Sequence, residues 1–256
     1  MNSTTIVEAF WPGALSANPS TSVVIVAGGS GDRFLNPNGK QLHRILGKPV
    51  LTWSAEAFDA VAEVGQIIIV APEDRIEEYV YEAIDGYSFV TPIVMAPSGA
   101  IRQESSFSGL SAVGDEFEFI AIHDGARPLV TPDLIDKMLT VIRGDLEVDG
   151  AVVGYPAIDT LKLVNDRVIL GTPDRTLLWV AQTPQIFRAP VIREAHVAAL
   201  SEGFVGTDDS SLVERLGGKM VLVQGPRDNI KITVPEDRLS IEAALLERAH
   251  ELDRLA

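Results

Sequence analysis

Hydrophobic residues along this chain alternate between short runs of strand length and helical patterns through the first two thirds of the sequence. Runs rich in Val and Ile predict buried strands over 23–27, 66–71, 89–96, 117–124 and 150–156. Between them, apolar residues at helical spacing predict helices over 50–64, 72–84, 101–113 and 131–143. This alternation predicts an α/β fold with a doubly wound, mixed but mostly parallel sheet. Ligands of such a sheet bind beyond the carboxyl ends of its strands.

The segment 157–180 departs from this rhythm. Polar and apolar residues alternate on both sides of "VNDRV", which predicts a β-hairpin instead of a crossover helix. Such a ribbon either lies along the sheet edge or projects as an arm that pairs with a second subunit. Further along, the pattern predicts helices over 190–202 and 208–217, strands over 219–225 and 229–234, and a terminal helix over 235–255. No internal repeat or low-complexity linker divides the chain, so we expect one domain over 22–256 after an extension over 1–21.

The charge balance narrows the choice of partner. The chain has 256 residues, and 21 Lys and Arg against 36 Asp and Glu leave a net charge of −15. Such a surface repels a polyanion unless basic residues cluster locally, so nucleic acid is not an expected partner. An anionic ligand would have to be held by a few focused cations.

Cysteine usage and hydropathy bear on compartment. The chain contains no cysteine, which excludes disulfides, thiolate metal sites and cysteine nucleophiles and is compatible with a reducing cytoplasm. No apolar run approaches the about 20 residues of a membrane span. The first twenty residues lack Lys and Arg and carry Pro12 and Gly13 where a signal peptide would be apolar. We therefore expect a cytoplasmic protein with no membrane partner.

The stretch "VVIVAGGSGDRFLNPNGKQL" (23–42) leads from an apolar run into a glycine-rich loop. Glycines directly after a strand let backbone N–H groups approach an anion. A dinucleotide-binding motif and a Walker A loop both require glycine at Phe34, and the Walker loop also requires Ser or Thr at Gln41. What remains is a glycine loop with two cations, Arg33 and Lys40. The alternative interpretation is a tight turn with two solvated charges.

Charged residues follow another predicted strand in "AIHDGARP" (121–128). His123, Asp124 and Arg127 lie at a strand's carboxyl end, where charge is more often functional than on a helix face. The alternative is a local Asp124–Arg127 ion pair that orders the turn. For His123 we expect a role in ordering the turn, and the other histidines have no metal-ligand spacing.

Two further segments carry candidate anion ligands. "PSGAIRQES" (97–105) places Gly99, Arg102 and Ser105 at a predicted helix start, where the alternative is a helix start with one cation. "DNIKIT" (228–233) puts Lys231 within an apolar pattern. Because lysine is seldom buried without a partner, Lys231 is a candidate phosphate ligand. A lysine that protects an edge strand is the alternative.

Together these segments resemble the 2-C-methyl-D-erythritol 4-phosphate cytidylyltransferases, within the nucleotidyltransferases that activate sugar and polyol phosphates. The resemblance covers about residues 22–245. It rests on "AGGSGDRF…GKQL", "GAIRQESSFSGL", "HDGARP", "DTLKLV", "DRTLLWVAQTPQIF", "TDDSSLVE" and "DNIKITVPEDRL", which occur in the family's order. It implies the nucleotide-diphospho-sugar transferase type of α/β fold, and transfer of CMP from CTP to methylerythritol phosphate.

The resemblance also implies roles for the residues that match these motifs. Arg33 and Lys40 would hold the CTP triphosphate and stabilise charge on the α-phosphate as the acceptor's phosphate attacks it. With Lys231 and Asp124 they would form the catalytic set. Cytosine and ribose would be held by a second group, namely Ala27, Gly28, Gly29, Ser30, Gly31, Gly99 and Ser105, with Arg102 in the same loop. Mg²⁺ or another divalent cation would be bound mainly by CTP phosphate oxygens, near Asp124 and Asp228.

On the acceptor side, the resemblance implies contacts from both subunits of a homodimer. Asp124, Arg127, Thr207 and Lys231 would face the methylerythritol phosphate. Thr160 and Arg175, on or beside the hairpin, would reach the neighbouring subunit's substrate.

The chain departs from the family's pattern at a few positions. Gly39 stands where the family usually has Pro, and Ser98 and Ala100 stand where it usually has Gly and an acid. The "AGG" form of the first loop also occurs in ribitol 5-phosphate cytidylyltransferases. A ribitol phosphate acceptor and an inactive nucleotide-binding homologue therefore remain as alternatives.

Overall fold

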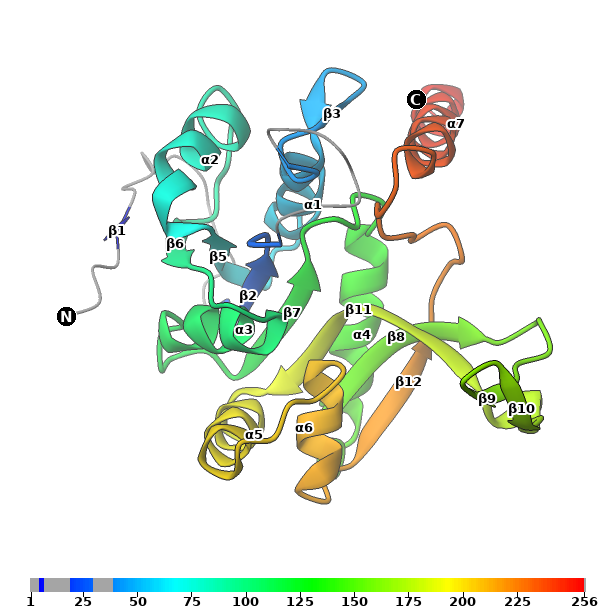
Figure 1. Ribbon diagram of the computed structural model, residues 1–256. Helices are drawn as coiled ribbons and strands as arrows, with labels where there is room; N and C mark the ends of the chain where they lie inside the picture. Colours follow the sequence, from blue (N-terminus) through cyan, green and yellow to red (C-terminus); the bar gives the residue numbers. More distant parts are fainter. Residues whose placement is uncertain (1–4, 7–18, 30–38, 256) are drawn as a thin grey trace.

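One mixed sheet organises the computed structural model of this chain (Figure 1), which describes residues 5–6, 19–29 and 39–255. In these residues the sheet has eight strands in the order β1-β6-β5-β2-β7-β11-β8-β12. Their bounds are β1 (Thr5–Ile6), β2 (Thr21–Val26), β5 (Val64–Ala71), β6 (Ile93–Pro97), β7 (Phe119–Asp124), β8 (Gly150–Pro156), β11 (Trp179–Arg188) and β12 (Met220–Gln224). All run parallel except β1 and β11, which are antiparallel to their neighbours. The predicted mixed, mostly parallel sheet is confirmed.

Helices cover both faces of the sheet, as expected of a doubly wound fold. Their bounds are α1 (Val50–Asp59), α2 (Ile76–Ala83), α3 (Arg102–Ser111), α4 (Pro132–Gly144), α5 (Ala189–Glu202), α6 (Asp209–Arg215) and α7 (Asp237–Leu255). Val23 and Ile25 of β2 face the core with α1, α2 and α4, whereas Val24 packs with α3, α5 and α6. Because both faces are buried, the strands are continuously apolar.

A smaller core lies at one end of the sheet. Here α7 packs, through Ile241 and Leu245, against Ile45 and Ile232. Ile45 belongs to a short hairpin, β3 (Arg44–Ile45) and β4 (Lys48–Pro49), that the sequence pattern did not reveal. This cluster fixes the segment around residue 232 beside the loop that follows β7.

The predicted hairpin within 157–180 is present. It consists of β9 (Leu163–Asn165) and β10 (Val168–Gly171), antiparallel to each other. Asp166 and Arg167, at φ 43° and 67°, form the turn, and positive φ at both central residues is the conformation that two-residue hairpins favour. Figure 1 shows this arm projecting from the sheet beyond β8 and β11.

Two sequence predictions were wrong. No strand was expected over 181–188, yet β11 lies between β7 and β8 in the centre of the sheet. Pro184 and its polar neighbours argue against a central strand, and the structure accommodates them with a register shift between Ala181 and Gln185. Conversely, 229–234 is not a strand. That segment is held by side-chain contacts and not by the backbone hydrogen bonds of a β-ladder.

Candidate active site

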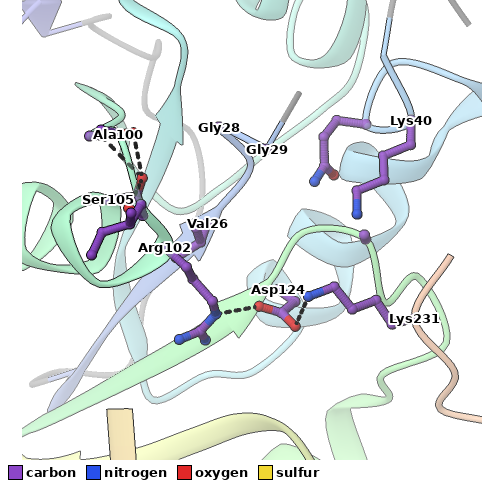
Figure 2. A pocket seen from close by; sticks show the side chains of 13 residues that line it. Val26, Gly28, Gly29, Lys40, Ala100, Arg102, Ser105, Asp124 and Lys231 are labelled. Carbon is purple, nitrogen blue, oxygen red and sulfur yellow. Dashed lines mark hydrogen bonds and ion pairs between the residues drawn. The ribbon is translucent and has the colours of Figure 1, made fainter. Parts of the chain in front are cut away.

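A cavity of about 320 Å³ lies at the carboxyl ends of β2, β6 and β7 (Figure 2). It is lined by Val26, Gly28, Gly29, Lys40, Gln41, Gly99, Ala100, Ile101, Arg102, Ser105, Asp124, Ala126 and Lys231. Most of the nucleotide and catalytic residues expected from the sequence are therefore brought together. They meet because parallel strands end at one edge of the sheet.

Asp124, the last residue of β7, holds two cations in this cavity. Its Oδ1 accepts from Arg102 Nε at 3.0 Å, and its Oδ2 accepts from Lys231 Nζ at 2.8 Å. Burial alone would raise the pKa of the Asp124 carboxyl. The charges of Arg102 and Lys231 outweigh that effect and hold its pKa well below the ordinary value of 3.8. The carboxylate is therefore ionised at neutral pH and orients both cations.

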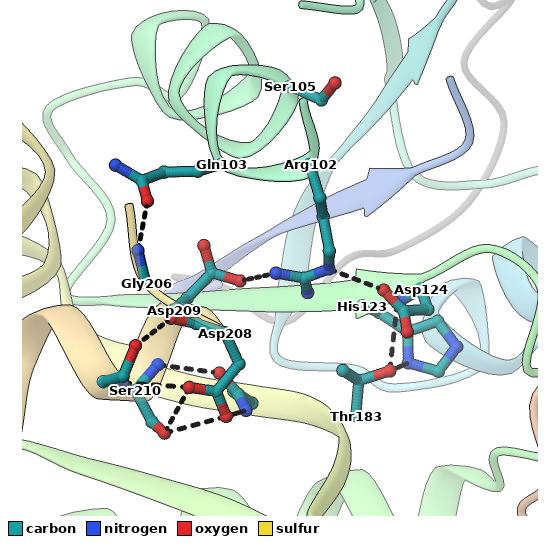
Figure 3. Close-up of polar contacts among 12 residues, drawn as sticks. Arg102, Gln103, Ser105, His123, Asp124, Thr183, Gly206, Asp208, Asp209 and Ser210 are labelled. Carbon is teal, nitrogen blue, oxygen red and sulfur yellow. Dashed lines mark hydrogen bonds and ion pairs between the residues drawn. The ribbon is translucent and has the colours of Figure 1, made fainter. Parts of the chain in front are cut away.

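Arg102, the first residue of α3, extends this network to α6. Its Nη1 donates to Asp209 Oδ2 at 2.6 Å (Figure 3). The other Asp209 oxygen lies 3.1 Å from Nε2 of the buried His196. Burial alone would raise the pKa of Asp209, but Arg102 and His196 lower it. Arg102 thus bridges two carboxylates on different elements. Neither Asp209 nor His196 was predicted from the sequence to belong to this network.

His123 orders the turn after β7, as expected. Its Nδ1 lies 3.2 Å from Thr183 Oγ1, which accepts from the backbone N–H of Asp124 at 3.0 Å. The hydroxyl proton therefore goes to Nδ1, and Nε2–H donates to the carbonyl of Arg127 at 3.2 Å. Burial lowers the pKa of His123 to about 3, so the ring is neutral at physiological pH. It is a structural part of the turn.

Asn229 anchors the segment that carries Lys231. Its side-chain N–H donates to the backbone carbonyl of Thr183 at 2.9 Å, while its backbone carbonyl accepts from Arg127 Nη1 at 2.7 Å. The Arg127 guanidinium does not line the cavity. Its Nε also lies 3.8 Å from Asp124 Oδ2, which is the local ion pair considered from the sequence. Gln182 also donates to the Asn229 carbonyl, at 3.1 Å. The sequence pattern gave no signal for either amide.

The two glycine-bearing loops of the cavity touch each other. A Cβ at Gly28 would lie 2.2 Å from Cβ of Ser98, so only glycine fits there. In the second loop, Gly99 N–H donates to Oγ of Ser105 at 3.1 Å. The fully buried Ala27 lies beneath the first loop, where its carbonyl accepts from Tyr79. Gly28, Gly29 and Gly99 line the cavity, so backbone atoms of both loops border it.

Other candidate residues lie elsewhere. Thr207 lines a second cavity, of about 710 Å³, with Leu177 and Trp179 at the base of the arm. Thr160 and Arg175 belong to the exposed arm, and Arg175 Nη1 donates to the carbonyl of Ile158 at 2.9 Å. Three further candidates, Ser30, Gly31 and Arg33, lie outside the described residues.

The described residues contain no group of three or more His, Asp or Glu side chains placed to hold a metal ion. Asp228, expected near a metal, forms an ion pair with Arg248 at 3.1 Å and does not line the cavity. Asp124 is the one carboxylate among the cavity's described lining residues.

Within the described helices, none has the length and apolar character to cross a membrane.

Known proteins are similar to this chain in both sequence and fold. A family model for 2-C-methyl-D-erythritol 4-phosphate cytidylyltransferase matches residues 21–248. An enzyme of that name from Caldanaerobacter subterraneus is 43% identical over 88% of this chain and 99% of its own length. Another, from Bacillus licheniformis, is 40% identical over 87% of this chain and 94% of its own.

Solved structures agree with the sequence matches. The 4-diphosphocytidyl-2C-methyl-D-erythritol synthase of Anaerococcus prevotii superposes with a TM-score of 0.77 at 29% identity, over 88% of this chain and 98% of that one. The 2-C-methyl-D-erythritol 4-phosphate cytidylyltransferase of Thermus thermophilus gives 0.70 at 28% identity, over 87% and 97%. The expected fold type is confirmed. With its sequence matched over most of its length, this chain belongs to the 2-C-methyl-D-erythritol 4-phosphate cytidylyltransferase family.

Proposed function

We propose that this enzyme transfers CMP from CTP to 2-C-methyl-D-erythritol 4-phosphate, releasing pyrophosphate, in the non-mevalonate route to isoprenoids. The observation that carries the proposal is the convergence of Lys40, Arg102 and Lys231 on one cavity that also contains the Asp124 carboxylate. Focused cations let an acidic protein bind a triphosphate. The family membership supplies the choice of nucleotide and acceptor.

In the reaction, an oxygen of the acceptor's phosphate forms a bond to the α-phosphorus of CTP. The bond between that phosphorus and the oxygen bridging to the β-phosphate breaks, and pyrophosphate leaves. A phosphate monoester is already ionised at neutral pH, so no general base is required. Catalysis then consists of positioning two polyanions and neutralising the charge on the transferring group.

Different residues of the site carry out these tasks. Lys40 holds the triphosphate together with Arg33, which lies outside the described residues. Lys231 neutralises charge on the α-phosphate as the acceptor attacks. Asp124 keeps Arg102 and Lys231 in place through its two oxygens. The loops at Gly28 and Gly99 bring backbone groups to the cytosine and ribose. Ser105 supports the second loop through its bond to the Gly99 N–H.

A divalent cation fits this donor set. Mg²⁺ in nucleotide enzymes is held by one or two carboxylates together with substrate phosphate oxygens. Asp124 is the one carboxylate among the described cavity residues, and its two oxygens also accept from Arg102 and Lys231. Asp228 is paired with Arg248 and does not line the cavity. When bound, the ion would neutralise negative charge on the phosphates. Asp124 would hold it together with the CTP oxygens.

For the acceptor, we propose a site shared between two subunits. Asp124, Arg127, Thr207 and Lys231 would come from one subunit, and Thr160 and Arg175 from its partner's arm. The arm exposes large apolar residues, among them Leu163, Val168, Ile169, Leu170 and Leu177, which are 58–80% exposed. Several exposed apolar side chains gathered on one arm favour an interaction site there.

The homodimer predicts a mass in solution twice that of one chain, measured by light scattering after size-exclusion chromatography. Shortening the arm by removing 163–171 should return the protein to one chain's mass. A full-length protein with the mass of one chain at micromolar concentration would contradict the shared site.

The acceptor is tested by a panel with pyrophosphate release as the readout. With CTP and Mg²⁺, methylerythritol phosphate should release pyrophosphate at a higher rate than ribitol 5-phosphate. A reversed order would identify a ribitol phosphate enzyme. CTP binding by calorimetry without turnover on either acceptor would indicate a nucleotide-binding protein without this activity.

A further inference from the structure

Gln103, which follows Arg102 in the first turn of α3, binds the backbone of a distant loop (Figure 3). Its Oε1 accepts from the N–H of Gly206 at 2.9 Å, and its Nε2 donates to the carbonyl of Phe204 at 3.0 Å. A carboxamide supplies a donor and an acceptor at once, so one side chain here satisfies two backbone groups. Residues 203–208, which connect α5 to α6, are thereby joined to the start of α3.

The loop's other anchors lie at its two ends. At the α5 end, Phe204 N–H donates to the carbonyl of Ala199 at 2.9 Å. At the α6 end, Asp208 caps the helix by accepting from Ser211 N–H at 3.0 Å. Between these ends, Val205 is 64% exposed. The middle of the loop therefore depends on Gln103 for its path.

Thr207 lies between two contacts made by the same turn of α3. Gln103 holds Gly206 on one side, and Arg102 holds Asp209 on the other through the 2.6 Å contact described above. Consecutive residues of one helical turn thus fix the segment from both sides, and that turn also contributes Arg102 to the cavity.

We propose that Gln103 is a positioning residue that holds Thr207 in place for the acceptor's phosphate. This inference rests on the proposed function, which assigns Thr207 to the acceptor. Gln103 lines neither the cavity at Asp124 nor the one at Thr207. Its effect is therefore transmitted through the loop, and it acts on the acceptor more than on CTP.

The kinetic test compares wild type with Gln103→Ala. The acceptor's KM should rise about tenfold, while kcat and the KM for CTP stay within about twofold of wild type, the pattern of lost uniform binding. Gln66→Ala is the matched control, because Gln66 also bridges chain segments, accepting from Ser22 Oγ at 2.9 Å on the sheet. It should leave both KM values unchanged. An unchanged acceptor KM in Gln103→Ala, or an equal rise in both KM values, would overturn the proposal.

Hydrogen–deuterium exchange tests the same contact without turnover. In Gln103→Ala, amides of 203–208 should exchange faster than in wild type, while those of α5 keep their protection. Unchanged exchange at 203–208 would overturn the proposal even if KM rises. Should the wild type prove inactive on both acceptors, the proposed function fails, and exchange alone then decides whether Gln103 holds the loop. Gln103→Glu, which loses the donor to Phe204, replaces the alanine variant if that variant does not fold.

Discussion

Replacing Lys231 by methionine should lower kcat by ~10²-fold or more, the scale of losing one charge partner of a transition state. Methionine keeps the apolar stem but removes the ammonium that contacts Asp124 Oδ2 at 2.8 Å. Without it, the charge that develops on the α-phosphate and the leaving pyrophosphate loses a fixed cation. The measurement is steady-state pyrophosphate release, with circular dichroism to verify folding.

Lys137→Met is the matched control for this change. Lys137 is an exposed lysine of α4 whose ammonium donates to the carbonyl of Gln224 at 2.8 Å, and it lines neither the cavity at Asp124 nor the one at Thr207. Its replacement should leave kcat unchanged.

Lys40→Ala should lower kcat on the order of 10²-fold as well, and so should Arg33→Ala, although Arg33 lies outside the described residues. An unchanged kcat in all three variants would contradict these catalytic roles and support the interpretation of the residues as solvated charges.

Replacing Arg102 by methionine should destabilise the fold by about 3–5 kcal/mol at neutral pH, because it removes the guanidinium that two buried carboxylates share. Asp209 is 1% exposed and Asp124 is 7% exposed, and both accept from this guanidinium. The free energy of unfolding in urea measures the loss. The variant should also lose activity, since Arg102 lines the cavity.

The double variant Arg102→Met with Asp209→Asn should recover part of that stability, since one unpaired charge is removed with its partner. Arg238→Met, at an exposed ion pair with Glu242, should cost less than about 1 kcal/mol. Equal losses at Arg102 and Arg238 would contradict the buried network.

The same network predicts a dependence of stability on pH. The folded-state pKa values of Asp124 and Asp209 lie below the ordinary value of 3.8. The stability that comes from ionised Asp124 and Asp209 is therefore complete above about pH 3.8 and is lost as the pH falls through the folded values. The difference in the free energy of unfolding between wild type and Arg102→Met should become smaller in that acidic range.

Much of the cavity could be predicted because local signals identify strand ends. The glycines after β2 and the charges after β7 follow apolar runs directly, and parallel strands bring such ends together. Asp124 and Arg102 were found in this way, whereas Lys231 was found because a lysine stood within an apolar pattern. The structure joins all three by hydrogen bonds. Gly39 was recorded as a departure from the family's pattern. Its φ of +73° is one that proline cannot adopt, so the conformation of this chain requires a residue other than proline there.

The supporting polar residues could not be predicted, because their partners lie far away in the sequence. Arg102 and Asp209 are 107 positions apart, and no periodic pattern marks such a pair. Gln103 and Asn229 read as ordinary polar residues, although both hold backbone groups of distant segments. The strand β11 was hidden for a related reason. Its polar residues pair inside the protein, so the apolar run that would reveal a strand is interrupted.

Phosphorus NMR of the reaction mixture tests the central claim most directly. With CTP, Mg²⁺ and methylerythritol phosphate, the wild-type chain should produce two coupled resonances of a new diphosphate diester, in an amount equal to the pyrophosphate released. Lys231→Met at the same concentration should form the same product far more slowly. Unchanged CTP, release of CMP in place of the diester, or equal product from Lys231→Met would contradict the account.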